Sequence, residues 1–337
     1  MIWPTIRQSG KPGMDSSEVW AIGVDLGGTK MEVAGVEADG KLRQKIRRPT
    51  QAERGPAAVK ADLVAAIKTI KNSFGPLPVG VGVGVAGQID SLNGMVRCSP
   101  NLGWEDEPCQ EDLRQALGLP VFVANDVRAA TWGEWLHGAG QGCADLICLF
   151  VGTGIGGGVV SGGQVLSGCS NSAGELGHIT IDLNGPSCRC GKRGCLEALA
   201  GGWAIARRAQ GLMAEDPRAG AFLLEIAVGK LEGVTAEMVA QASQKRDPLA
   251  LRVIDEATEA LIAGAASLVN AFNPCRLILG GGVIEGLPEL VDRIAQGVRE
   301  QALKAAAEPL QIVLSELHND AGVVGAAALA MRSINKN

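Results

Sequence analysis

Residues 19–48 read VWAIGVDLGGTKMEVAGVEADGKLRQKIRR, and this stretch decides the fold. The β-branched apolar run at 19–25 ends in a glycine turn at 26–29, and alternating apolar and polar residues resume at 30–36. A second turn, EADG at 37–40, precedes another strand-like run. Tight turns of this kind join neighbouring antiparallel strands. The stretch therefore predicts a three-stranded meander whose first turn presents bare backbone N–H groups.

A second strand that ends in a glycine-rich turn occurs at 146–158, LICLFVGTGIGGG. We expect the turn at 152–158 and a short strand at 159–160. Periodicity then predicts helices at 57–70, 111–117, 126–136, 248–272, 290–304 and 323–331, and further strands at 79–86, 121–124, 276–279 and 312–314. Strand, glycine turn and strand thus occur near the start of each half. The pattern predicts a duplicated α/β unit that faces itself across a cleft, with a domain boundary near 124–125.

Composition narrows the class of protein. The chain has 337 residues, 46% hydrophobic and 20% charged, enough for a large core and about two domains. Its net charge of −5 argues against a main role in binding nucleic acid or anionic membranes, because both need a basic protein surface. No apolar run reaches the roughly 18 residues that span a bilayer, and residues 1–18 do not resemble a secretory signal. Cysteines scattered singly are typical of a reducing compartment, so we expect a cytoplasmic protein.

Two glycine turns carry groups that suit a phosphate. DLGGTK at 25–30 combines backbone N–H groups with a Thr hydroxyl and a Lys ammonium, and GTGIGGG at 152–158 offers similar chemistry from the second half. Either turn alone is equally well read as an ordinary hairpin, but two such turns favour a phosphate chain. Gly280–Gly282 allow close approach of a nucleobase or ribose, although helix–sheet packing explains these glycines almost as well.

A cluster of cysteines and one histidine predicts a metal site. His178, Cys188, Cys190 and Cys195 supply three thiols and an imidazole, a complete tetrahedral set for Zn²⁺. Four protein ligands leave no open position, so the zinc is expected to be structural. The alternatives are a reduced cysteine-rich loop or a disulfide.

Polar residues at the ends of elements suggest a sugar. Asn125 and Asp126 follow a strand and open a helix, where an Asp often serves only as an N-cap. Glu175 lies three residues before the metal-site histidine, and Glu197 two residues after its last cysteine. Two carboxylates fixed in this way suit adjacent hydroxyls of a sugar ring. Asn101, in SPNLGW, adds an amide from the first half.

These motifs together resemble the ROK family of sugar kinases and repressors, within the actin-like ATPase/hexokinase superfamily. The motifs that carry the resemblance are DLGGTK at 25–30, SPNLGW at 99–104, ND at 125–126, VGTGIGGG at 151–158, GELGH at 174–178, CRCGKRGCLE at 188–197 and LGGG at 279–282. The resemblance implies two actin-like (ribonuclease H-like) α/β domains with mixed sheets flanked by helices and a cleft between them. The expected domains are 19–124, with the C-terminal helix 321–337 packed on it, and 125–320, which includes the zinc loop 178–197.

The resemblance also implies roles for individual residues. Asp126 matches the family's catalytic base. Sugar-binding positions are matched by Asn101, Asn125, Asp126, Glu175, His178 and Glu197, and zinc ligands by His178, Cys188, Cys190 and Cys195. ATP-binding positions are matched by Asp25, Gly27, Gly28, Thr29, Lys30, Gly152, Thr153, Gly154, Gly156, Gly280, Gly281 and Gly282. The sequence departs from the family's usual NDxNAA at Arg128, a change that bears on substrate preference more than on the reaction.

The implied activity is ATP- and Mg²⁺-dependent phosphorylation of a hexose primary hydroxyl, with glucose as the default sugar. N-acetylmannosamine, N-acetylglucosamine, mannose, fructose and allose stay open, as does polyphosphate as donor. The resemblance also implies a homodimer. A transcriptional repressor is disfavoured because the 18 or so residues before Val19 contain two prolines and two glycines and are too few for a DNA-binding domain. A non-catalytic sugar sensor is disfavoured because the proposed catalytic and phosphate-binding residues are intact.

Overall fold

The structure is a computed structural model that describes residues 19–90, 92–216 and 218–334. The chain forms two compact units. Unit 1 comprises the described residues up to Gly133 together with those from Gly322 onward, and unit 2 comprises Glu134–Ala321. The division falls inside helix α3 (Asp126–His137) rather than at the expected 124–125, and the last helix belongs to unit 1.

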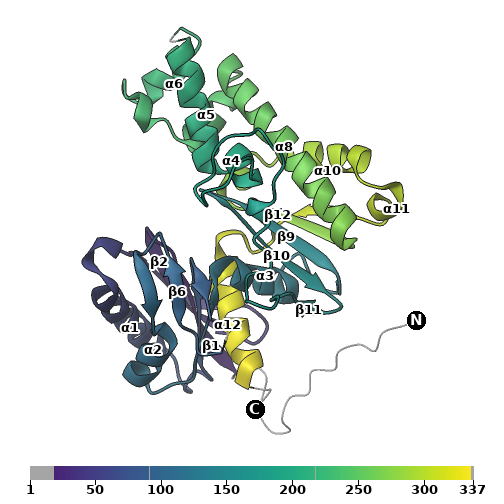
Figure 1. Cartoon of the computed structure of the whole chain (residues 1–337). Coiled ribbons are helices and arrows are strands. Elements are labelled where there is room, and N and C mark those ends of the chain that lie inside the picture. Colours follow the sequence, from purple (N-terminus) through teal and green to yellow (C-terminus); the bar gives the residue numbers. More distant parts are fainter. Residues whose placement is uncertain (1–18, 91, 217, 335–337) are drawn as a thin grey trace. The chain divides into compact units, whose positions relative to one another are not determined.

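Unit 1 is built on a five-stranded sheet in the order β3-β2-β1-β4-β8 (Figure 1). Its strands are β1 (Trp20–Leu26), β2 (Lys30–Glu37), β3 (Leu42–Pro49), β4 (Val81–Val85) and β8 (Val121–Asn125). The first three form the predicted antiparallel meander, and β4 and β8 continue the sheet in parallel with β1. The carboxyl ends of β1, β4 and β8 therefore lie side by side.

Helices cover this sheet because its inward residues are almost wholly apolar. They are α1 (Pro56–Asn72), α2 (Cys109–Leu117), the first part of α3 and α12 (Ala321–Ile334), with a 3₁₀ turn at Ala52–Arg54. Helix α12 rests directly on β4, since a Cβ on Gly82 would lie 1.7 Å from the carbonyl oxygen of Ala326. Only glycine permits that approach, which brings the chain's last helix onto its first sheet.

A three-stranded sheet in unit 1 was missing from the sequence prediction. It consists of β5 (Gln88–Ile89), β6 (Val96–Ser99) and β7 (Trp104–Glu107), joined antiparallel in that order. The turn between β6 and β7 carries Asn101. The small sheet therefore positions one of the residues expected to bind sugar.

Unit 2 repeats the plan of unit 1, as the duplicated strand–turn–strand pattern predicted. Its sheet order is β11-β10-β9-β12-β13, with β9 antiparallel to β10 and parallel to β12. The strands are β9 (Leu146–Val151), β10 (Ile155–Ser161), β11 (Gln164–Val165), β12 (Arg276–Gly280) and β13 (Gln311–Leu314). The expected strand at 159–160 was too short, because β10 already begins at Ile155. The mixed α/β architecture is confirmed.

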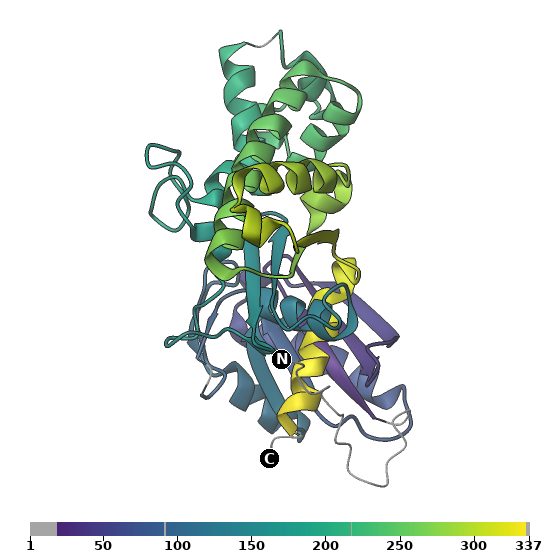
Figure 2. The same cartoon turned by 90° about the vertical axis from the view of Figure 1, so that its right-hand side faces the viewer.

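Helices of unit 2 pack around the long, mostly buried helix α8. They are α4 (Leu196–Ala200), α5 (Gly202–Glu215), α6 (Ala221–Ile226), α7 (Ala236–Gln244), α8 (Pro248–Phe272), α9 (Gly282–Gly286), α10 (Leu290–Gln301) and α11 (Lys304–Ala307), with 3₁₀ turns at Leu176–His178 (η2), Leu231–Gly233 and His318–Asp320. The single helix expected at 290–304 is thus two, since the chain is extended at Ala302. Figures 1 and 2 show α6 at the end of unit 2 that lies away from β9 and β10, whereas α5 begins beside the turn between these two strands.

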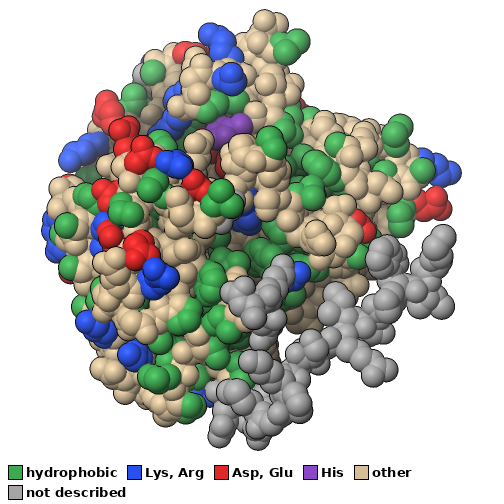
Figure 3. All heavy atoms as spheres, turned by 60° about the horizontal axis from the view of Figure 1, so that its bottom comes forward, with side chains coloured by type: hydrophobic (Ala, Val, Ile, Leu, Met, Phe, Trp, Pro, Cys, Tyr) green, Lys and Arg blue, Asp and Glu red, His purple; other side chains and the backbone are tan. Residues whose placement is uncertain are grey.

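The surface agrees with the charge balance of the sequence. On the face drawn in Figure 3, acidic and basic side chains are interspersed among apolar ones. Within the residues that the structure describes, no helix is both long and apolar enough to cross a membrane.

Candidate functional site

The glycine turn between β1 and β2 is fixed by hydrogen bonds and by the loop of Asn101. The Gly27 N–H donates to the Lys30 carbonyl at 3.0 Å, and the Thr50 hydroxyl donates to the Gly27 carbonyl at 2.7 Å. A Cβ on Gly28 would lie 2.5 Å from the Asn101 backbone oxygen. The structure therefore brings the proposed phosphate turn and a proposed sugar-binding residue into contact within unit 1.

Asn125 and Asp126 stand where β8 passes into α3. Asn125 pairs with Val85 of β4, whose neighbour Gly84 pairs with Asp25 of β1, so the two motifs share one end of the sheet. The Asn125 Oδ1 accepts from the Arg128 N–H at 3.0 Å, and its Nδ2 donates to the Gly87 carbonyl at 3.2 Å. Asn125 thus provides an N-cap side chain for α3.

Three carboxylates, those of Asp25, Glu32 and Asp126, interact electrostatically at this end of unit 1. Burial, and then the negative charges of Asp126 and Glu32, raise the pKa of Asp25 to about 7. Glu32 is itself buried, with the Lys30 Nζ at 3.4 Å, the Arg47 Nε at 3.7 Å and the Lys45 Nζ at 3.8 Å from its oxygens. An ionised Asp25 is therefore costly in these surroundings, and a bound cation would relieve that cost.

In unit 2 the corresponding turn is Gly152–Gly154, closed by a hydrogen bond of 2.9 Å from the Gly152 N–H to the Gly154 carbonyl. Thr153 is exposed at its tip. Gly280 pairs with Phe150 at the end of β9, and Gly281 contacts the backbone of Val151. The two loops expected to bind ATP in this half therefore lie at the same end of one sheet.

Gly156 and the glycines after it are not part of the turn, because they lie inside β10. A Cβ on Gly157 would lie 2.5 Å from the Leu176 side chain of η2. The glycine run therefore lets η2 pack on the strand, which places Glu175 and His178 beside β10.

The segments that carry Glu175, His178 and Glu197 are joined through the backbone. The Leu196 N–H donates to the Ile179 carbonyl at 2.9 Å, and Thr180 forms a β-bridge with Cys195. Glu175 is exposed, whereas Glu197 is partly buried in the first turn of α4. The expectation that the cysteine loop brings the two carboxylates to one region of the fold agrees with this backbone pairing.

Glu197 accepts hydrogen bonds from two protein donors that the sequence analysis did not predict. Its Oε2 accepts from the Ile155 backbone N–H at 3.0 Å, immediately after the turn of Gly152–Gly154. Its Oε1 accepts from the indole Nε1 of Trp203 at 3.2 Å. Trp203 lies at the start of α5, and its sequence position alone gives no spacing signal for this contact.

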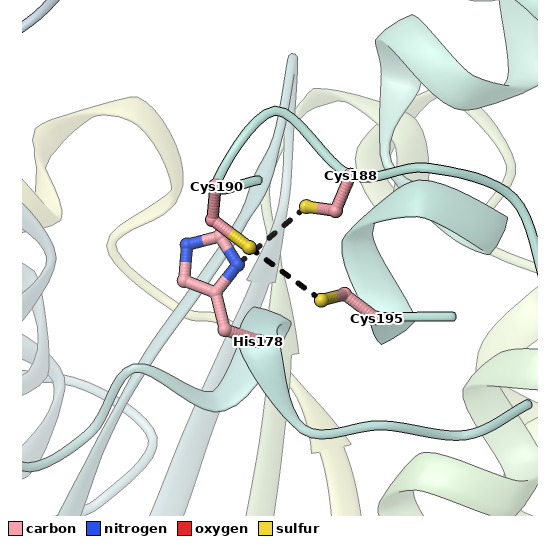
Figure 4. Close-up of side chains that lie close together, drawn as sticks. All are labelled: His178, Cys188, Cys190 and Cys195. Carbon is pink, nitrogen blue, oxygen red and sulfur yellow. Dashed lines mark hydrogen bonds between the residues drawn. The ribbon is translucent and has the colours of Figure 1, made fainter. Parts of the chain in front are cut away.

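The histidine and three cysteines converge on one point, as Figure 4 shows. The Cys188 Sγ lies 3.8 Å from the His178 Nδ1, and the Cys190 Sγ lies 3.7 Å from the Cys195 Sγ; all four ligand atoms lie within 4.8 Å of one another. Zn–S bonds of about 2.3 Å in a tetrahedron place sulfurs about 3.8 Å apart. The donor set and its spacing therefore fit a tetrahedral zinc ion.

The loop geometry supports this arrangement. The Cys188 N–H donates to the Lys192 carbonyl at 2.7 Å. Gly194 has a positive φ of 65°, and a Cβ there would lie 1.6 Å from the Asp182 carbonyl oxygen. The Lys192 backbone lowers the pKa of the Cys190 thiol, whereas burial raises the pKa of Cys188 and of Cys195. The Nδ1 of His178 faces the thiols. A hydrogen bond from this imidazole to a second group would therefore use its Nε2.

Comparison with known proteins gives consistent matches over nearly the whole chain. The ROK family model matches residues 21–333. The chain is 37% identical over 314 residues to a glucokinase of Thermotoga maritima, covering 93% of this chain and 98% of that one. It is 32% identical over 319 residues to an N-acetylmannosamine kinase of Citrobacter koseri, covering 92% and 98%. The structure of a ROK family glucokinase from Streptomyces griseus, in complex with glucose and AMPPNP, matches with a TM-score of 0.82 and 34% identity, covering 93% and 99%.

Proposed function

Because the chain belongs to the ROK family, we propose that it transfers the γ-phosphoryl group of ATP to the primary hydroxyl of a hexose, with glucose as the substrate and glucose 6-phosphate as the product. The observation that carries the proposal is the end of the unit 1 sheet, where Asp126 opens a helix capped by its neighbour Asn125. Asp25 and the turn that follows it stand at the same end. The glucokinase of Thermotoga maritima supports glucose as the sugar.

In this proposal Asp126 is the general base. A sugar hydroxyl is a weak nucleophile, so a carboxylate that orients it and accepts its proton favours attack on the γ-phosphorus. Asn101 and Asn125 bind the sugar from unit 1, and the residues of 25–30 bind phosphate. Mg²⁺ accompanying ATP would supply positive charge against the phosphates. That charge would also favour ionisation of the carboxylates around Asp25.

Unit 2 contributes the other binding groups. The turn of Gly152–Gly154 binds phosphate, and Gly280–Gly282 lie where adenosine would approach the backbone. Gly156 lies in β10 directly after this turn and is assigned to ATP binding together with it. Glu175, Glu197 and the Nε2 of His178 accept or donate hydrogen bonds to the sugar ring. Each of these groups lies on the β9–β10 side of unit 2 or on the segments packed against it.

We further assign a structural zinc ion to His178, Cys188, Cys190 and Cys195. Its support is the four-atom cluster and the spacing of its sulfurs. The ion would hold η2 and the start of α4 together and would leave no coordination position for substrate. All nine cysteines lie at described positions and none forms a disulfide there, which supports the proposed cytoplasmic location. We also propose that the protein forms a homodimer.

An N-acylhexosamine kinase is the second candidate, favoured by the relative from Citrobacter koseri. A sugar panel decides between the two. The purified protein is incubated with ATP, Mg²⁺ and glucose, mannose, fructose, allose, N-acetylglucosamine or N-acetylmannosamine, and ADP release is measured. We expect the highest kcat/KM with glucose and no release above background with Asp126→Asn. A higher kcat/KM with an N-acyl sugar would favour the second candidate, and no turnover with any sugar would overturn the proposal.

A further inference from the structure

The carboxylate of Glu197 is held in a fixed plane by one N–H donor on each oxygen. The donors are the Ile155 backbone at 3.0 Å and the Trp203 indole at 3.2 Å. An ionised carboxylate offers about four acceptor positions. Each oxygen therefore keeps capacity for a sugar hydroxyl while its direction is set by the protein.

Trp203 is itself firmly placed. Its backbone N–H donates to the Thr153 carbonyl at 2.9 Å, which ties the start of α5 to the phosphate turn. The guanidinium groups of Arg189 and Arg207 each lie 4.7 Å from the centre of its ring. Arg207 also donates to the Ser187 carbonyl at 3.3 Å. Cation–π contacts and hydrogen bonds thus orient the indole between the cysteine loop and α5.

We propose that Trp203 is a positioning residue that aims the Glu197 carboxylate at the sugar. The inference rests on the proposed function, in which Glu197 binds the hexose. It adds a residue that touches neither ATP nor sugar in that proposal and acts only through Glu197. A carboxylate with one oxygen released from its donor would rotate, and its hydrogen bonds to adjacent hydroxyls would weaken.

A simple packing role is the competing explanation, since the ring also packs against Cys188, Cys195 and Ala198. Packing depends on the ring, whereas positioning depends on the indole N–H. Trp203→Phe tests the two explanations because it removes the indole N–H and keeps a smaller aromatic ring at the same position. Trp135→Phe is the matched control in the same unit, because it makes the same reduction in ring size where the indole donates to the Cys143 carbonyl at 2.8 Å.

Glucose affinity is measured by calorimetry without nucleotide, alongside KM for glucose, KM for ATP, and kcat. We expect Trp203→Phe to raise the glucose Kd and KM about tenfold, the loss typical of a hydrogen bond to a charged group. KM for ATP should change less than twofold and kcat less than threefold, because the backbone bonds of α5 to the turn remain. Trp135→Phe should leave glucose affinity unchanged.

A double variant shows whether Trp203 acts through Glu197. In a Glu197→Gln background, Trp203→Phe should weaken glucose binding by less than a further twofold. A full additional tenfold loss would overturn the inference, as would unchanged affinity in the single variant. If Trp203→Phe does not fold, Arg189→Ala tests the same inference, because Arg189 is exposed and its guanidinium lies over the Trp203 ring. We expect it to raise the glucose Kd about threefold, and no change would contradict the inference.

The proposed function and the role of Trp203 can be refuted separately. A wild-type protein that binds and phosphorylates no hexose overturns the proposed function and, with it, the role of Trp203. A wild-type protein that phosphorylates glucose while Trp203→Phe binds it equally well overturns only the role of Trp203.

Discussion

Replacing Asp25 by Asn should make the protein more stable and less active. The Asp25 pKa rises from 3.8 to about 7 because of burial and the nearby Asp126 and Glu32. The folded protein therefore holds this proton more tightly than the unfolded chain does. The free energy of unfolding must then fall as pH rises from about 4 towards 7, and the loss is complete above the folded pKa. Asn keeps the shape and removes the charge.

The size of the effect follows from the two pKa values. At about 1.4 kcal/mol per pKa unit, the raised pKa of Asp25 lowers the free energy of unfolding, relative to a neutral group, by about 4 kcal/mol at pH 8 and by about 2 kcal/mol at pH 5. Asp25→Asn should therefore raise the free energy of unfolding by about twice as much at pH 8 as at pH 5. The same change removes a group assigned to ATP binding, so kcat/KM for ATP should fall at least tenfold.

Urea unfolding at pH 5, 6, 7 and 8, followed by tryptophan fluorescence, measures the change. Asp39→Asn is the control, because it neutralises an exposed aspartate in a turn and should change stability by less than about 0.5 kcal/mol at every pH. A stability gain at Asp25 that does not grow with pH would refute the electrostatic reasoning. A variant with full activity would remove Asp25 from the ATP site.

Three other changes test the proposed site. Asp126→Ala should fold normally, because Asn125 caps α3, yet lower kcat by roughly 10²–10⁴-fold or more; retention of a tenth of kcat would exclude a base. Elemental analysis should find one zinc ion per chain. Cys190→Ser should lose the zinc and glucose affinity with it, whereas the control Cys169→Ser, at an exposed cysteine, should keep both. Wild-type protein that contains no zinc after purification without chelator would contradict the assignment. Glu175→Gln should raise KM for the sugar about 10–150-fold, the range for a charge-assisted hydrogen bond, with KM for ATP nearly unchanged. A similar rise in KM for ATP would make Glu175 a structural residue.

Strong local patterns made much of the framework predictable. The meander of β1–β3 follows from apolar runs separated by two glycine turns, and α8 follows from a long apolar face between Pro248 and Asn273. The cysteine cluster was predictable because its spacing is short and the ligand chemistry is restrictive. The family resemblance inferred from these motifs is confirmed by the match over residues 21–333.

Features that depend on tertiary contacts were not predictable. Strands β5–β7 are two to four residues long and mostly polar, so they lack a periodic signal. The start of β10 was missed because glycines in a strand resemble a loop, and only the packing of Leu176 on Gly157 explains them. Trp203 meets Glu197 because α4 and α5 fold back on the turn after β9. No spacing in the sequence reports that approach.

The central claim is that this chain phosphorylates the 6-hydroxyl of glucose with Asp126 as the base. Phosphorus-31 NMR of a reaction containing glucose, ATP and Mg²⁺ tests it directly, because the phosphate ester and ADP are resolved in one spectrum. We predict that wild-type protein forms glucose 6-phosphate and ADP in equal amounts, and that Asp126→Asn forms neither above background. Formation of inorganic phosphate in place of a sugar ester, or equal ester formation by both proteins, would contradict the claim.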